Sequence, residues 1–128
     1  MPLNNNKGLL IYGLDMTEQV TLSKILEDCG EATYKIILSG MADMKLKDII
    51  EGIKFETYPK DLPENEKVIL FNNFSDEQLN KMIAGLRNKF TNPPILAVIT
   101  ATTLEWTFKE LIIHLVKERE FLKKNNKV

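Results

Sequence analysis

The chain has 128 residues, which suits one domain with a single hydrophobic core. Its 17 Lys and Arg residues against 18 Asp and Glu residues leave a formal net charge of −1, so no global field attracts nucleic acid or an anionic membrane. No apolar run approaches the roughly 18 residues that a membrane-spanning helix requires. We therefore expect a single domain over 1–128 that binds neither nucleic acid nor membrane, with 1–6 and 125–128 as candidates for disordered ends.

The cellular compartment can be predicted from two features. The apolar run after Lys7 is too short for a signal peptide and no small-residue cleavage site follows it. Cys29 is the only cysteine, which excludes an internal disulfide and suits a reducing compartment. A cytoplasmic location is the expectation.

Four apolar runs of strand length alternate with four segments of helical periodicity. The expected strands cover 7–14, 33–38, 67–72 and 95–100, and the expected helices cover about 16–29, 43–51, 76–89 and 103–124. The apolar runs are nearly continuous, which is typical of strands buried on both faces. This alternation predicts an α/β fold with a three-layer, open, mainly parallel four-stranded sheet and the element order βαβαβαβα. Right-handed crossovers favour the strand order 2-1-3-4.

Three helix starts are predicted from capping boxes, in which a capping oxygen stands three residues before a Glu or Gln. The boxes are DMTE (Asp15–Glu18), SDEQ (Ser75–Gln78) and TTLE (Thr102–Glu105). The last helix would be roughly 30 Å long, so its final turns should project beyond the sheet. Residues 55–66 contain two prolines and mixed charge, and we expect a loop that could hold a short edge strand.

Polar residues follow each expected strand and define a candidate ligand site. In a sheet of this order, ligands bind in the crevice above the carboxyl ends of strands one and three. The residues expected to line this rim are Asp15, Ser39, Asn72, Asn73, Thr100 and Thr102. Amides, hydroxyls and one carboxylate suit an uncharged polar ligand better than a nucleotide, whose phosphates favour glycine-rich turns and a cation.

Catalytic, metal and cofactor motifs are missing from the sequence. It contains no phosphate-binding or dinucleotide-binding glycine motif and no nucleophile elbow. One His and one Cys cannot build a zinc site of the usual composition within one chain. His114 falls in the middle of the last helix and Cys29 on the apolar face of the first, so both are interpreted as structural residues. We expect no metal, no cofactor and no catalytic residue, and an enzyme is the less favoured interpretation.

Trp106 and Ile113 stand apart from the apolar stripe of the last expected helix. At 100° per residue they project roughly opposite the main stripe. Either another part of the chain covers them, or they form an apolar patch for a protein partner or a second copy.

Part of the chain resembles a known family. FSDEQLNKMIAGLR (74–87), followed by PPILAVITATTLEWTFKELIIHLVKERE (93–120), resembles a bacterial family recorded only as a domain of unknown function. The resemblance covers about 67–120 and implies an α/β fold in a bacterial cytoplasm, without assigning an activity.

Two functional hypotheses follow. The leading one is a small non-enzymatic module that binds a partner, or forms a homodimer, through the last helix. The alternative is a small-molecule sensor or enzyme that binds an uncharged polar ligand at the rim.

Overall fold

The computed structural model describes residues 7–30, 34–53, 62–63 and 65–125. The strands are β1 (Gly8–Tyr12), β2 (Tyr34–Ile36), β3 (Val68–Asn72) and β4 (Ile95–Val98). The helices are α1 (Met16–Asp28), α2 (Leu46–Glu51), α3 (Asp76–Lys89) and α4 (Phe108–Asn125), with short 3₁₀ turns at Ser39–Met41 and Thr103–Glu105. The expectations for 1–6, for 126–128 and for most of the 55–66 loop lie outside the described residues.

The four strands form one sheet in the predicted order β2-β1-β3-β4. β1 pairs with β2 in parallel, and β3 pairs with β4 in parallel. The central pair is antiparallel, because Gly8 lies opposite Asn72 and Tyr12 lies opposite Val68. The α/β class and the strand order are confirmed, and the sheet is mixed, with its two halves running in opposite directions.

The antiparallel direction of β3 agrees with where α2 ends and where β3 starts. α2 ends beside β2, where the Lys35 ammonium donates to the carbonyl of Ile50 at 2.5 Å. Ile50 lines a small hollow with Gly8 at the start of β1 and Asn72 at the end of β3. β3 instead starts beside the end of β1, where a Cβ on Gly13 would lie only 2.3 Å from the carbonyl oxygen of Glu66. The end of α2 and the start of β3 thus lie at opposite ends of the sheet, and β3 runs antiparallel to β1.

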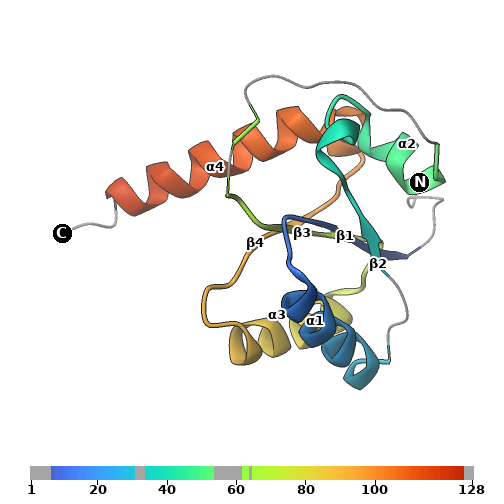
Figure 1. The fold of residues 1–128 in the computed structure, drawn as a ribbon, viewed down its shortest axis with the longest axis vertical. Coiled ribbons are helices and arrows are strands. Elements are labelled where there is room, and N and C mark those ends of the chain that lie inside the picture. The colour runs from blue at the N-terminus through green and yellow to red at the C-terminus, as the bar shows by residue number, and fades with distance from the viewer. Residues whose placement is uncertain (1–6, 31–33, 54–61, 64, 126–128) are drawn as a thin grey trace.

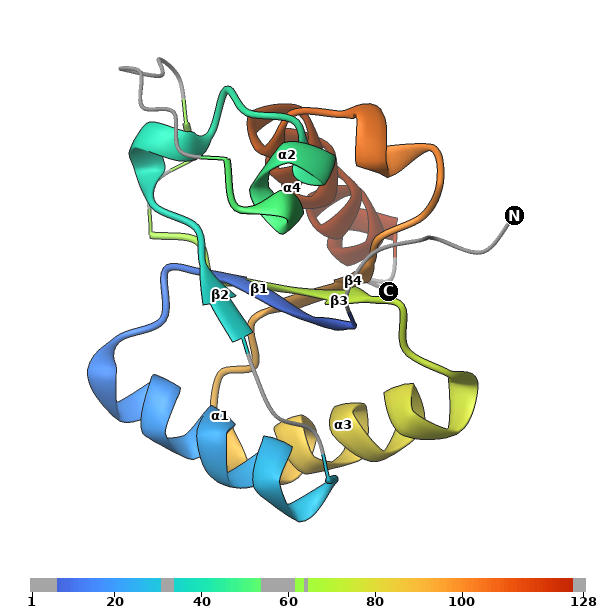
Figure 2. The ribbon, with the colours of Figure 1, turned by 90° about the vertical axis from the view of Figure 1, so that its right-hand side faces the viewer.

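Helices cover both faces of the sheet, as Figure 2 shows: α1 and α3 lie on one face, and α2 and α4 on the other. Alternate residues of β1 and β3 serve the two cores. Leu9, Ile11, Ile69 and Phe71 pack with α1 and α3. Leu10, Val68 and Leu70 pack with α2 and α4. The three-layer arrangement follows directly from the two-residue period of buried strands.

Two of the three expected capping boxes are present. Asp15 accepts from the backbone N–H of Glu18 and Ser75 accepts from that of Gln78, while Glu18 and Gln78 each accept from the cap's own N–H. α3 has the predicted bounds, 76–89. Exposed caps of this kind stabilise a helix by about 1 kcal/mol each.

The third expected capping box is wrong, and so is the expected start of the last helix. Thr102 makes no side-chain cap hydrogen bond, and Trp106 has an extended backbone with φ −83° and ψ 151°, which interrupts any helix from 103. The helix begins at Phe108, with Thr107 and Glu110 forming the box in TFKE. Glu105 lies instead 3.1 Å from the ammonium of Lys47.

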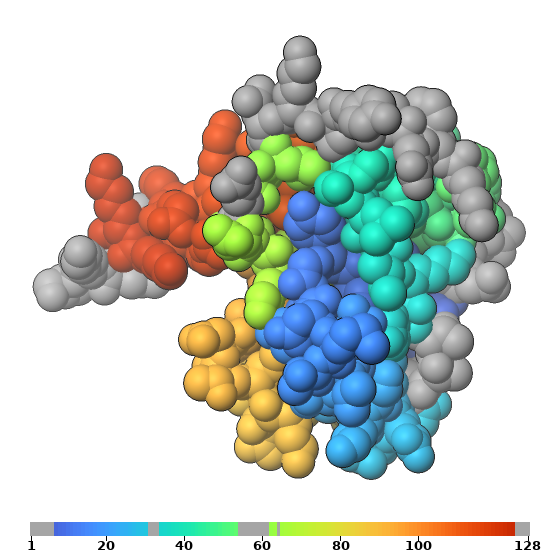
Figure 3. Space-filling view, in the orientation of Figure 1, coloured from blue at the N-terminus to red at the C-terminus, as the bar shows by residue number. Residues whose placement is uncertain are grey.

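α4 has 18 residues and, as predicted, projects beyond the sheet on the β4 side (Figure 1). The space-filling view shows a hollow between the projecting end of α4 and α3 (Figure 3). Among the described helices, none is long and apolar enough to cross a membrane.

Candidate functional site

The residues expected to share one rim lie at two opposite ends of the sheet. Asp15 and Ser39 follow β1 and β2, which are parallel to each other. Asn72, Asn73 and the turn at 100–102 follow β3 and β4, which run the other way. The crevice that a parallel sheet would form above strands one and three is therefore not assembled from these six residues.

At the end that holds Asp15, the carboxylates are engaged by hydrogen bonds within the chain. Asp15 Oδ1 accepts from the N–H of Glu18 at 2.8 Å. The Glu18 carboxylate accepts from the Lys67 ammonium at 2.7 and 2.8 Å, and this contact raises the pKa of Lys67. Ser39 lies exposed at the start of a 3₁₀ turn. The carboxylates here stabilise a helix start and tie it to the residue before β3.

At the opposite end of the sheet, Thr100 and Thr103 are hydrogen-bonded to each other. The N–H of Thr100 donates to Thr103 Oγ1 at 2.8 Å, and the N–H of Thr103 donates to Thr100 Oγ1 at 3.1 Å. Asn72 is buried at 2% exposure, whereas Asn73 is exposed with φ 65°. Thr102 is exposed. The structure thus gives this turn a local structural role.

Trp106 and Ile113 are both half-buried, and Trp106 contacts its own chain. Its indole packs against the core beneath α4 and meets the His114 ring edge-on at a centroid distance of 5.5 Å. Its carbonyl oxygen accepts from the N–H of Leu46. A shallow hollow of about 270 Å³ lies over Trp106, Ile113, His114 and two neighbours on α4. Intrachain packing accounts for a large part of the Trp106 surface.

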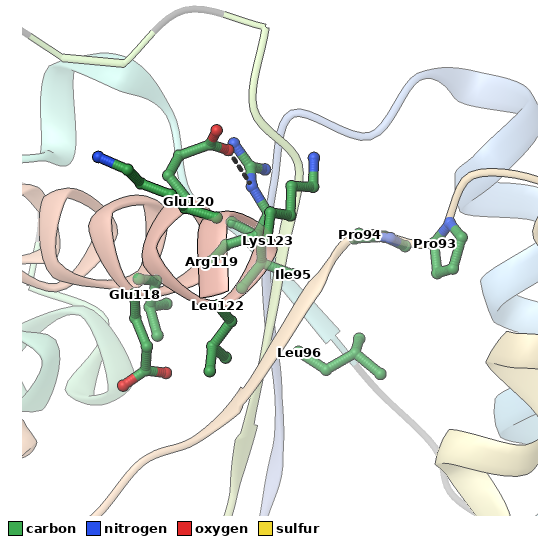
Figure 4. Close-up of a pocket in the computed structure, with 11 residues that line it drawn as sticks. Pro93, Pro94, Ile95, Leu96, Glu118, Arg119, Glu120, Leu122 and Lys123 are labelled. Atoms are coloured by element: carbon green, nitrogen blue, oxygen red, sulfur yellow. Dashed lines mark hydrogen bonds and ion pairs between the residues drawn. The ribbon is translucent and has the colours of Figure 1, made fainter. Parts of the chain in front are cut away.

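A larger groove, which sequence reasoning missed, lies between the projecting end of α4 and β4. It has a volume of about 1120 Å³ and is lined by Pro93, Pro94, Ile95, Leu96, Leu115, Glu118, Arg119, Glu120, Leu122, Lys123 and Lys124. Figure 4 shows Leu122 directed away from the Arg119–Glu120 pair, on the side of α4 nearer to β4. Leu122 is 53% exposed. We call this hollow the α4–β4 groove.

An ion pair fixes the part of α4 that forms one wall of the groove. The Arg119 guanidinium donates to both carboxylate oxygens of Glu66, at 2.6 and 2.8 Å, and to Glu120 at 2.9 Å. Arg119 holds the pKa of the Glu66 carboxyl below its usual value, and Glu66 raises the pKa of Arg119. A two-pronged pair of this kind restricts orientation more than a single contact does. The overhang of α4 is therefore anchored to the residue that precedes Lys67 and β3.

The other wall is the free edge of the sheet. Among the described strands β4 pairs only with β3, and its residues are half-buried except Val98, which is 47% exposed. The sequence signal for this edge was present in the uncharged run ILAVIT after two prolines, but its position in the sheet becomes visible only with the strand order.

No group of three or more His, Cys, Asp or Glu side chains in the described part of the chain is arranged to hold a metal ion. Cys29 is half-buried at the end of α1, and His114 is exposed on α4. The His114 imidazole lies 3.7 Å from the Glu118 carboxylate.

Comparison with known proteins yields one family. Neither the curated proteins nor the solved structures include a significant match to this chain. The family model described as "Domain of unknown function (DUF3783)" matches residues 67–122, the segment that builds β3, α3, β4 and most of α4. The expected resemblance to a domain of unknown function is thereby confirmed over the segment that forms nearly all of the α4–β4 groove.

Proposed function

We propose that this protein is a non-enzymatic binding module of the bacterial cytoplasm, which holds another protein chain in the α4–β4 groove. The single observation that carries this proposal is the overhang of α4 beside a sheet edge with which no other described strand pairs. Leu122, on this overhang, is exposed to solvent and lines the groove together with Ile95, Leu96 and Leu115. Exposed apolar surface that is concave and rimmed by charges is typical of protein-binding sites.

The anchoring of the groove supports a role in binding. A long helix end without contacts would fray, yet here Arg119 fixes α4 through Glu66. A preformed groove pays less conformational entropy on binding than one that must be ordered. Charged residues at its border, among them Glu118, Lys123 and Lys124, can orient a partner without supplying most of the affinity.

The groove is favoured over the two sites expected from the sequence. Trp106 already packs against its own chain, which leaves less apolar area there for a partner. The six rim residues lie at opposite ends of the sheet, so a small ligand could not contact Asp15 and Thr100 together through one crevice.

Site-specific photocrosslinking tests the proposal in cells of the native host. A photoreactive amino acid replaces Leu122 in one variant and Val20 on α1 in another, because both side chains are 53% exposed. We expect a discrete covalent adduct from position 122 and none from position 20. Equal labelling at the two positions, or none at either, would refute a partner site in the groove.

A further inference from the structure

The outer edge of β4 has a short, sharply bounded set of free backbone donors. The N–H groups of Ile95 and Ile99 donate to carbonyls at the β3 side, so the alternation of a parallel ladder directs those of Leu96 and Val98 outward. Within the described residues no partner occupies these two groups. Pro94 has no N–H, and the N–H of Thr100 is bound by Thr103 Oγ1.

We propose that the occupant of the α4–β4 groove is a second copy of this chain, whose β4 pairs antiparallel with β4 across a two-fold axis at Ala97. This inference rests on the proposed function, because it names the partner. In this register Leu96 of each copy lies opposite Val98 of the other. Each of these two pairs exchanges two N–H···O bonds, so the four outward N–H groups of the dimer are all bonded. Pro94 then lies opposite Thr100 of the second copy. Pairing leaves no donor unsatisfied there, because Pro94 has no N–H and the N–H of Thr100 is already bound by Thr103 Oγ1.

The side chains fit the same register. Leu96 packs with the core on the α1 and α3 face, and the strand alternation puts Val98 on that face, where it is 47% exposed. Pairing would set each Val98 against a Leu96, so two half-open apolar side chains would cover each other. Ala97 lies at the axis, where opposed residues of an antiparallel pair come closest, at about 4.5 Å between Cα atoms.

The two edges of the sheet differ in how they are protected. β2 has three residues with Lys35 at its centre, and a charge there discourages pairing with another sheet. β4 has the sequence ILAV, without charge, bulge or internal proline. Only the β4 edge therefore has the features of a strand that pairs with another chain.

The overhang of α4 supplies the area that a strand pair lacks. A stable dimer buries about 1,200–2,000 Å² in total, more than two four-residue strands provide. A two-fold axis perpendicular to the sheet would set both α4 helices antiparallel on one face, each extending over the partner's β4. One continuous eight-stranded sheet would result.

The test measures the self-association of the full chain by sedimentation equilibrium over a wide concentration range. Val98→Pro removes an outward N–H without touching the bonds to β3. Ile36→Pro is the matched control on β2, because the N–H of Ile37 donates to Ile11 and that of Ile36 points outward, with 44% exposure at Ile36. We expect a wild-type dimer, a dissociation constant raised at least about tenfold by Val98→Pro, and no change with Ile36→Pro.

Folding of each variant is checked by circular dichroism. If a proline variant does not fold, Val98→Lys and Ile36→Lys replace the pair, because lysine keeps the N–H and adds an edge charge. Wild-type protein that stays monomeric at all concentrations overturns the inference, and so does a dimer that Val98→Pro or Val98→Lys leaves intact.

A crosslink tests the register itself. Ala97→Cys in a Cys29→Ser background should form a disulfide-linked dimer on mild oxidation, because the expected Cα separation suits a disulfide. Ile36→Cys in the same background should not. Failure of Ala97→Cys to crosslink a dimeric protein overturns the two-fold at Ala97. A photoadduct from position 122 with a protein other than this chain would overturn the second copy as the occupant while supporting the groove as a binding site.

Discussion

Replacing Gly13 with Ala should destabilise the fold far more than the same change at Gly52. Both glycines have a left-handed backbone, with φ +82° and +83°. An L side chain in that conformation costs about 1–2 kcal/mol, and this penalty is common to both positions. A Cβ at Gly52 would meet no atom within 4 Å, whereas at Gly13 it would lie 2.3 Å from the Glu66 carbonyl oxygen and 3.3 Å from its carbon.

The extra cost at Gly13 can be estimated from that contact. Relief requires the backbone before β3 to move by most of an ångström, and overpacking of this kind costs about 1–3 kcal/mol. Gly13→Ala should therefore lower the free energy of unfolding by about 2–5 kcal/mol, against about 1–2 kcal/mol for Gly52→Ala. Urea unfolding followed by circular dichroism measures both. Equal losses in the two variants would show that the close approach at Gly13 does not constrain the chain.

Two other predictions concern α4. Thr107→Ala should lower the free energy of unfolding in urea by about 1 kcal/mol, because it removes the N-cap of α4. Thr102→Ala should lower it by less than half of that, because Thr102 makes no cap hydrogen bond. A larger loss at Thr102 than at Thr107 would contradict the observed helix start. Glu66→Gln should lower the free energy of unfolding at pH 7 by about 1 kcal/mol, because it weakens the ion pair with Arg119. Because the folded pKa of Glu66 is depressed, its contribution is complete above its unfolded pKa of about 4.3 and is lost as the pH falls through the folded pKa. The stability difference between wild type and Glu66→Gln, measured from pH 7 down to about pH 3, should therefore shrink; a difference that grows on acidification would contradict the assigned ion pair.

The elements that could be predicted from sequence are those with dense local signals. α3 has a capping box at Ser75, with Phe74 and Leu79 in staple positions and an apolar stripe, and its bounds were predicted correctly. The start of α4 was not, because two Thr-x-x-Glu patterns follow each other and only the surroundings decide between them. The backbone N–H of Leu46 donates to the carbonyl oxygen of Trp106, whose extended backbone excludes the earlier helix start.

Strand direction has no comparable local signal. Alternation of apolar runs and helices predicts that β3 lies beside β1, but it does not report from which end the chain enters. The candidate rim depended on that direction, and the antiparallel pairing of Gly8 with Asn72 therefore separated Asp15 from Thr100. The α4–β4 groove depends on strand order and helix overhang together, which are properties of the assembled fold.

The backbone contacts at the start of α4 also bear on how the chain could be divided. Phe108 and Lys109 donate their N–H groups to the carbonyls of Met44 and Ala42, so the first turn of α4 is completed by residues that precede the matched family segment. Helix starts need such acceptors, since their first N–H groups have none within the helix. A fragment cut at residue 67 would lose these acceptors along with β1, the neighbour of β3. The stretch matched by the family model is thus a unit of sequence similarity, while the hydrogen bonds and strand pairing that complete its structure cross its boundary.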